Sequence, residues 1–96
     1  MIQTDEEMYI GIGLGRMRNE RDWTQEKLAE MSQLSYRTVQ NIEYNRTSPS
    51  GTSICKFAKA FEMEPWEFLR TISDEIIYKP RKQKTKKKSI PSRNSI

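Results

Sequence analysis

The chain has 96 residues, of which 34% are hydrophobic and 31% charged, which indicates one domain with a small core. A single cysteine, Cys55, and no histidine exclude an internal disulfide, a His-based catalytic triad and a zinc cluster. No apolar run approaches the ~18 residues of a membrane span, and the acidic N-terminus does not resemble a secretory signal. We therefore expect a cytoplasmic protein with no membrane partner.

The net charge of +4 is distributed unevenly. Residues 79–96 contain eight Lys and Arg and no acidic residue, whereas residues 1–78 contain nine basic and 13 acidic residues. This asymmetry favours a polyanionic partner, with nucleic acid as the first candidate. We predict an acidic lead-in over 1–7, a helical domain over 8–78 and a disordered basic tail over 79–96.

Helical periodicity predicts a first helix over residues 6–21, with Thr4 and Glu7 as a capping box. Three glycines between positions 11 and 15 weaken this helix, each by roughly 1 kcal/mol relative to Ala. They indicate either close helix packing or a frayed first turn. Their spacing does not fit the dinucleotide-binding G-x-G-x-x-G fingerprint, and no strand is predicted before them.

The next two helices have clear start signals. Thr24 and Ser35 are each placed as an N-cap, and only about three residues separate the helices that they begin. This arrangement is typical of a helix-turn-helix. The predicted inward positions of the two helices are Leu28, Ala29, Met31, Val39 and Ile42, with Leu34 as the buried link.

Residues 48–51 break the chain before a fourth helix, and Pro65 fits the first position of a fifth helix that ends at Pro80. The predicted stripe of the fourth helix is Ile54, Phe57, Ala58 and Phe61, and that of the fifth is Trp66, Leu69, Ile72 and Ile76. No segment alternates with period two, so we expect an all-α fold without strands.

The remaining large side chains are assigned to packing. The aromatic residues predicted to lie in the core are Trp23, Phe57, Phe61, Trp66 and Phe68. Cys55 is predicted to be a partly buried structural thiol rather than a reactive one.

Five different motifs lie at characteristic spacings along the chain. They are Leu14-x-x-Met17-Arg18, Trp23-Thr24-Gln25-Glu26-x-Leu28-Ala29, Leu34-Ser35-x-x-Thr38-Val39-x-x-Ile42-Glu43, Pro49 and Ile54-x-x-Phe57-Ala58-x-Ala60-Phe61. Together they resemble, without gaps, the Cro/phage-repressor helix-turn-helix family, the XRE-type or lambda-repressor-like domain. The resemblance implies a compact five-helix domain with a recognition helix over about 35–44. Gln33 and Glu62 stand where the family often has glycine, so a strained positive φ is expected in the turn at Gln33.

A recognition helix lies in the major groove of DNA with its N-terminal residues at the base edges. The outward positions predicted to contact bases are Tyr36, Arg37, Gln40 and Asn41. Arg37 can hold guanine by two hydrogen bonds, and the Gln40 and Asn41 amides match adenine. Tyr36 is suited to a sugar or a thymine methyl group. The alternative for each residue is an ordinary solvated helix face.

Phosphate contacts are expected at helix N-termini, where N–H groups and the helix dipole attract anions, and in the loop after the recognition helix. The resemblance assigns Gln25 to such a contact. The predicted phosphate set is Thr24, Gln25, Ser35, Thr38, Tyr44, Asn45, Arg46, Thr47 and Ser50. The resemblance also implies that Arg18 and Glu43 form an ion pair that orients the recognition helix, the alternative being two unrelated surface charges.

These features predict a sequence-specific transcriptional regulator, a repressor or autoregulator that binds double-stranded DNA as a homodimer on a palindromic operator. The fifth helix, extended by Ile76, Ile77 and Tyr78, is the predicted dimer interface. No nucleophile–base pair, metal cluster or phosphate loop indicates an enzyme, a cofactor or a small-molecule substrate.

Two alternative functions stay open. A protein-interaction module such as an antitoxin combines this kind of fold with a disordered tail and a protein partner. A non-specific nucleic-acid binder would instead act through the tail, whose basic positions include Lys82, Lys84, Lys86, Lys87 and Lys88. With DNA as the partner, the protein is expected at the nucleoid.

Overall fold

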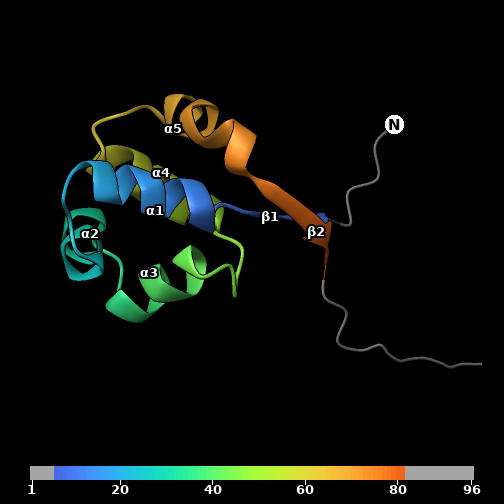
Figure 1. Cartoon of the computed structure of the whole chain (residues 1–96), viewed down its shortest axis with the longest axis horizontal. Helices are drawn as coiled ribbons and strands as arrows, with labels where there is room; N and C mark the ends of the chain where they lie inside the picture. Colours follow the sequence, from blue (N-terminus) through green and yellow to red (C-terminus); the bar gives the residue numbers. More distant parts are fainter. Residues whose placement is uncertain (1–5, 82–96) are drawn as a thin grey trace, which may run out of the picture.

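The computed structural model describes residues 6–81, which form five α-helices, one 3-10 turn and two short strands (Figure 1). In chain order these elements are β1 (Glu6–Tyr9), α1 (Gly11–Glu20), α2 (Gln25–Ser32), α3 (Tyr36–Glu43), α4 (Gly51–Ala60), α5 (Pro65–Ile72), η1 (Ser73–Glu75) and β2 (Ile77–Pro80). The five-helix body confirms the predicted fold class. No helix in this part of the chain is long and apolar enough to cross a membrane. Lead-in residues 1–5 and tail residues 82–96 lie outside the described residues.

The helix-turn-helix consists of α2 and α3, and local hydrogen bonds set where each helix begins. The Thr24 hydroxyl accepts a hydrogen bond from the Lys27 N–H at 3.0 Å, and the Ser35 hydroxyl accepts one from the Thr38 N–H at 3.0 Å. Both predicted N-caps are therefore present. Gln33 caps the end of α2 with a φ of 60°, in the left-handed region expected for this turn.

The core is one cluster to which all five helices contribute. Its buried members are Ile10, Leu14, Met17, Leu28, Ala29, Val39, Ile42, Phe57, Ala58, Ala60, Phe61, Phe68 and Ile72. The Phe61 ring stacks with the rings of Trp23 and Phe68, with ring centroids 5.4 Å and 6.0 Å away. Leu34 lies partly buried against this cluster, so the turn of the helix-turn-helix is attached to the core.

Three side chains predicted to be at least partly buried are exposed. Trp66 is 61% exposed, Met31 is 42% exposed, and the Cys55 thiol is also exposed. Cys55 and Trp66 each precede a fully buried phenylalanine, Phe57 or Phe68, by two residues. At about 100° per residue, this spacing turns them toward the opposite side of their helix.

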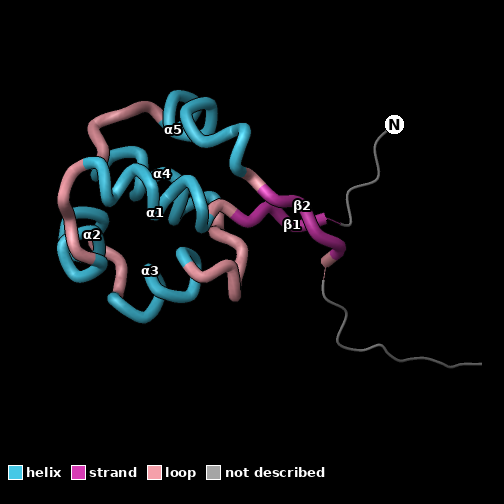
Figure 2. Tube along the Cα trace, viewed as in Figure 1, coloured by secondary structure: helices cyan, strands magenta, loops and turns pink. Residues whose placement is uncertain are grey.

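Residues 6–9 form a strand, so the prediction of a helix over 6–21 is wrong at its start. β1 pairs antiparallel with β2, with Glu7 opposite Lys79 and Tyr9 opposite Ile77 (Figure 2). Glu7 therefore lies in a strand and not in the predicted capping box. The expectation of no strands fails because each strand's hydrogen-bonding partner lies at the other end of the domain, where local periodicity carries no signal.

The C-terminal boundary of the last helix also differs from the prediction. α5 ends at Ile72, well before Pro80, and Ile76 lies partly buried against the core beyond the 3-10 turn. Lys79 and Pro80, predicted to begin the tail, belong to β2. A proline is tolerated there because β2 is an edge strand of a two-stranded sheet.

Two glycines allow α1 to pack closely on both sides. A Cβ on Gly13 would lie 2.5 Å from the Cβ of Ile72 in α5. A Cβ on Gly11 would lie 2.5 Å from the Asn45 side-chain oxygen and would clash with the Glu43 carbonyl oxygen at the end of α3. Close helix packing, one of the two predicted roles, therefore explains these positions.

Candidate nucleic-acid interface

α3 has one face anchored in the core and one face that carries the predicted base contacts. Val39 and Ile42 are 0% and 2% exposed, whereas Tyr36 and Arg37 at the start of the helix are exposed. Gln40 lies one turn after Tyr36 and is half-buried. The buried pair therefore holds the helix while its first turns present polar groups to solvent.

Several predicted contact residues pair with one another on this exposed face. Gln40 donates from Nε2 to the Tyr36 hydroxyl oxygen at 3.0 Å. Arg46 donates from Nη1 to the Asn41 side-chain oxygen at 3.2 Å, and its guanidinium carbon lies 5.0 Å from the centroid of the Tyr44 ring. These pairs reduce the number of rotamers that the side chains sample before any ligand arrives.

Arg37 and Thr47 are exposed and form no side-chain hydrogen bond with any of residues 6–81. The five N–H donors of the Arg37 guanidinium are therefore available to an external acceptor. Among the predicted base contacts, Arg37 is the one whose full hydrogen-bonding capacity stays unused by the described chain.

Arg18 and Glu43 form a two-bond ion pair between α1 and α3. Arg18 Nε lies 2.6 Å from Glu43 Oε2, and Arg18 Nη2 lies 3.1 Å from Glu43 Oε1. Arg18 Nη1 also donates to the Trp23 carbonyl oxygen at 2.6 Å. Because only 15% of the Arg18 side chain and 6% of the Glu43 side chain are exposed, water does little to screen this pair.

Gln25 is a third member of this network, which sequence reasoning did not detect. It donates from Nε2 to Glu43 Oε1 at 3.0 Å, so α2 is tied to the same carboxylate that ties α1 to α3. Its predicted phosphate contact would have to use the remaining side-chain groups or the backbone N–H at the start of α2. A glutamine at a helix N-terminus has no local signature for such a distant partner.

The other predicted phosphate residues divide into helix caps and loop residues. Ser50 caps α4 as Thr24 and Ser35 cap α2 and α3. Asn45 has a φ of 58°, and its side-chain oxygen accepts a hydrogen bond from the Gly11 N–H at 2.8 Å. This bond joins the loop after α3 to the start of α1, so the loop is held in place by α1.

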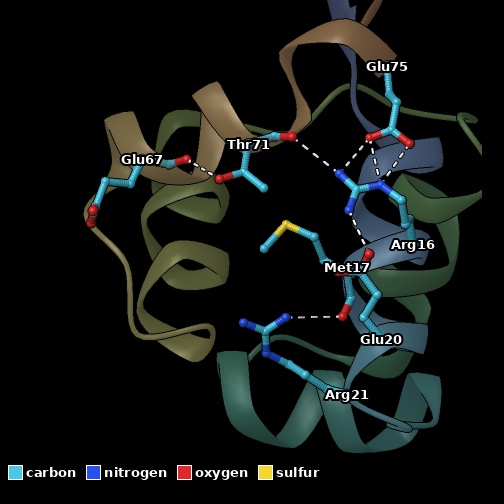
Figure 3. A network of polar contacts seen from close by, with 7 residues as sticks. All are labelled: Arg16, Met17, Glu20, Arg21, Glu67, Thr71 and Glu75. Carbon is cyan, nitrogen blue, oxygen red and sulfur yellow. Dashed lines mark hydrogen bonds and ion pairs between the residues drawn. The ribbon is translucent and has the colours of Figure 1, made fainter.

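A second network lies on the side of α1 that faces α5 and η1 (Figure 3). Arg16 donates to both carboxylate oxygens of Glu75, at 2.8–3.0 Å, and to Glu20 Oε2 at 2.9 Å. It also reaches the Thr71 carbonyl oxygen at 3.2 Å. These hydrogen bonds lower the pKa of the Glu75 carboxyl. The network ties α1 to the turn that leads into β2.

Comparison with known proteins supports the assignment of the middle of the chain to a helix-turn-helix family. A family model described as helix-turn-helix matches residues 14–68, more than half of the 96 residues. The matched region includes all of α2, α3 and α4 but neither strand. No curated protein matches the chain.

Proposed function

The chain belongs to the XRE-type helix-turn-helix family of DNA-binding transcription regulators, and we propose that it is a sequence-specific repressor or autoregulator of a palindromic operator. The protein acts by occupancy: bound at its operator on nucleoid DNA in the cytoplasm, it blocks or recruits polymerase.

One observation carries the proposal, namely the two-faced character of α3. A buried face fixes the helix, and the opposite face carries an arginine with no partner among residues 6–81 and amides with free donor or acceptor groups. Arginine matches the guanine O6 and N7 acceptors, and a primary amide matches adenine. We assign base contacts to Tyr36, Arg37, Gln40 and Asn41 on this basis.

Phosphate contacts fix the register of such a helix on DNA. The capped starts of α2, α3 and α4 offer backbone N–H groups, and Arg46 and Thr47 are exposed in the loop after α3. We assign the contacts with DNA phosphates to these groups. The main-chain groups and the remaining side-chain groups of Gln25, Thr38, Tyr44 and Asn45 complete the set.

The proposed DNA-binding species is a homodimer, because a palindromic operator is matched by a two-fold protein. A dimer interface on an extended fifth helix does not fit the fold, since Ile77 and Tyr78 lie in β2. Tyr78 is 59% exposed on that strand. The two-stranded sheet is therefore the part of the predicted dimer interface to test.

The basic tail is proposed to supply sequence-independent affinity for the DNA backbone. Removing residues 82–96 removes five lysines and one arginine while leaving β2 whole. We expect a flatter plot of log affinity against log salt, since each released phosphate contact changes the slope by about 0.9. An unchanged slope would assign the salt dependence to the helical domain instead.

The proposal is tested by selecting duplexes from a randomised pool with the full chain at near-physiological salt. The expected result is a palindromic consensus with half-sites about one helical turn, ~34 Å, apart. Arg37→Ala should lose preference at one base position, at a cost of about 1–3 kcal/mol, while Arg70→Ala, on the exposed side of α5, serves as the matched arginine control. Enrichment without any consensus would overturn sequence-specific binding and favour an interaction module or a charge-driven binder.

A further inference from the structure

Two shallow cavities, of about 300 and 140 Å³, meet at Met31 between the end of α2 and the second half of α4. We call this surface the α2–α4 groove. Met31 lines both cavities and is 42% exposed, and Trp23 lines the larger one beside Phe61, on which it stacks. The basic residues that line the groove are Arg21, Lys56 and Lys59. None of the lining residues belongs to α3 or to the predicted DNA contacts.

Arg21 is held in place at the α2–α4 groove by aromatic rings and a backbone carbonyl. Its guanidinium carbon lies 4.6 Å from the centroid of the Phe61 ring and 5.9 Å from that of the Trp23 ring. Its Nη1 donates to the Met17 carbonyl oxygen at 3.3 Å (Figure 3). A guanidinium has five N–H donors, so most of them stay available. Stacking on a ring leaves the edge of the planar group free to bind a carboxylate through parallel hydrogen bonds.

The positive charges of the groove are not balanced by the described part of the chain. Arg21, Lys56 and Lys59 form no ion pair with any of residues 6–81. Glu62 also lines the larger cavity, but it too forms no ion pair with these residues. Residues 1–78 contain more acidic than basic side chains, so the groove is a local excess of positive charge on an acidic domain.

An acidic peptide with a large apolar side chain matches both properties of the groove. The apolar side chain would cover Met31 and Trp23, while carboxylates beside it would meet Arg21 and the two lysines. A DNA phosphate would satisfy the cations but would leave the apolar surface uncovered. Methionine, aromatic residues and arginine are also the side chains enriched at protein–protein interfaces.

We propose that the α2–α4 groove is a docking site for an acidic segment of a partner protein, in which a large apolar residue lies next to Asp or Glu. The inference goes beyond the proposed operator binding and does not depend on it, because no residue of the groove is assigned to DNA. Gln33 lines the smaller cavity, so the partner would lie next to the turn of the helix-turn-helix.

Selection of random peptides against the full chain tests the proposal, with non-specific duplex DNA present to compete for the basic tail. The expected consensus is a large apolar residue adjacent to Asp or Glu. Arg21→Gln should weaken binding of the selected peptide about 10-fold or more, as for other arginines at the centre of an interface. Lys59→Glu should weaken it about 3- to 5-fold, because it reverses an exposed charge at the rim.

Two features of the variants keep the test decisive. Arg70→Gln, on the exposed side of α5, is the matched control and should bind the peptide like the parent. Lys59 is exposed, so Lys59→Glu should melt like the parent even if Arg21→Gln loses stability with its packing on Phe61. Titration of the labelled peptide with each variant makes the comparison.

Three results would overturn the inference. The first is that no peptide is enriched, or that the consensus lacks acidic residues. The second is peptide binding that neither Arg21→Gln nor Lys59→Glu weakens, which would place the peptide on the tail or another surface. The third is self-association of the full chain that Lys59→Glu abolishes, which would assign the groove to a second copy of this protein.

Discussion

α1 carries two arginines, Arg16 and Arg18, that make similar bonds in different surroundings. Arg18 and Glu43 leave 15% and 6% of their side chains exposed, whereas Arg16 and Glu75 leave 36% and 26% exposed. The first pair joins α1 to α3, and the second joins α1 to the turn before β2. Loss of one partner leaves an unpaired charge in the buried pair but returns the exposed partner to water. Burial, rather than bond count, therefore decides which network holds the fold together.

The largest effect is expected from Arg18→Ala. The change leaves the Glu43 carboxylate buried without its charge partner, a loss of about 3 kcal/mol, at the lower end of the range for broken buried pairs. Thermal unfolding should move down by more than 10 °C, since about 1 kcal/mol corresponds to roughly 4–8 °C in a domain of this size. Affinity for operator DNA should fall as well, because Glu43 lies at the end of α3.

The double variant Arg18→Ala with Glu43→Gln supplies the control. It removes the stranded charge, so part of the lost stability should return, while the orientation of α3 stays impaired. Calorimetry and DNA titration on the same samples make this check. Unchanged melting and unchanged binding in Arg18→Ala would remove the role assigned to the pair.

Gly11→Ala probes the same α1–α3 contact through packing rather than charge. The new Cβ would clash with the Glu43 carbonyl oxygen, which is backbone and moves only if α3 moves. We expect a loss of about 1–3 kcal/mol, as for other overpacked sites, and weaker DNA binding. Gly15→Ala is the matched control, because its Cβ would meet the Glu43 side chain at 3.5 Å, an ordinary contact. This variant should be stabilised by up to about 1 kcal/mol, since alanine has the higher helix propensity. Equal melting of the two variants would contradict this account of the contact.

The features of the fold differ in how far the sequence alone predicts them. The caps Thr24 and Ser35 and the buried positions Val39 and Ile42 could be predicted because a cap and a helical repeat are local. The family resemblance implied the pairing of Arg18 with Glu43.

The remaining features depend on residues that are distant in sequence. The sequence near Tyr9 does not indicate that this residue pairs with Ile77. Likewise, the sequence near Gln25 does not indicate its hydrogen bond to Glu43, and the sequence near Arg16 does not indicate its bond to Glu75. Only the contact of Arg16 with Glu20 has the i, i+4 spacing that a helix makes visible in the sequence. The two strands and the hydrogen bonds between Arg16 and Glu75 therefore could not be predicted from the sequence, because they join residues that only the tertiary structure brings together.

Arg16→Ala should have a smaller effect than Arg18→Ala. Both partners of Arg16 are partly exposed, so solvent screens the ion pairs and rehydrates Glu75 and Glu20 when the arginine is removed. We expect the melting temperature to fall by a few degrees and operator affinity to stay within error of the parent, measured by the same titration. A loss of binding as large as that of Arg18→Ala would break the comparison and make the arm formed by β1 and β2 part of the DNA-binding unit.

The smallest effect concerns pH and isolates Glu75. Hydrogen bonds from Arg16 lower the pKa of this carboxyl below its ordinary value of 4.5, so the folded state favours the ionised form. The resulting stabilisation is present above pH 4.5 and is lost as the pH falls through the lower, folded-state pKa. The melting temperature of the parent should exceed that of Glu75→Gln at neutral pH, and the difference should shrink as the pH falls below about 4.5.

Asp74→Asn, which changes an adjacent carboxyl that makes no ion pair with residues 6–81, should melt in parallel with the parent across the same range. A constant difference between the parent and Glu75→Gln down to pH 3 would show that Glu75 acts through packing and not through its charge.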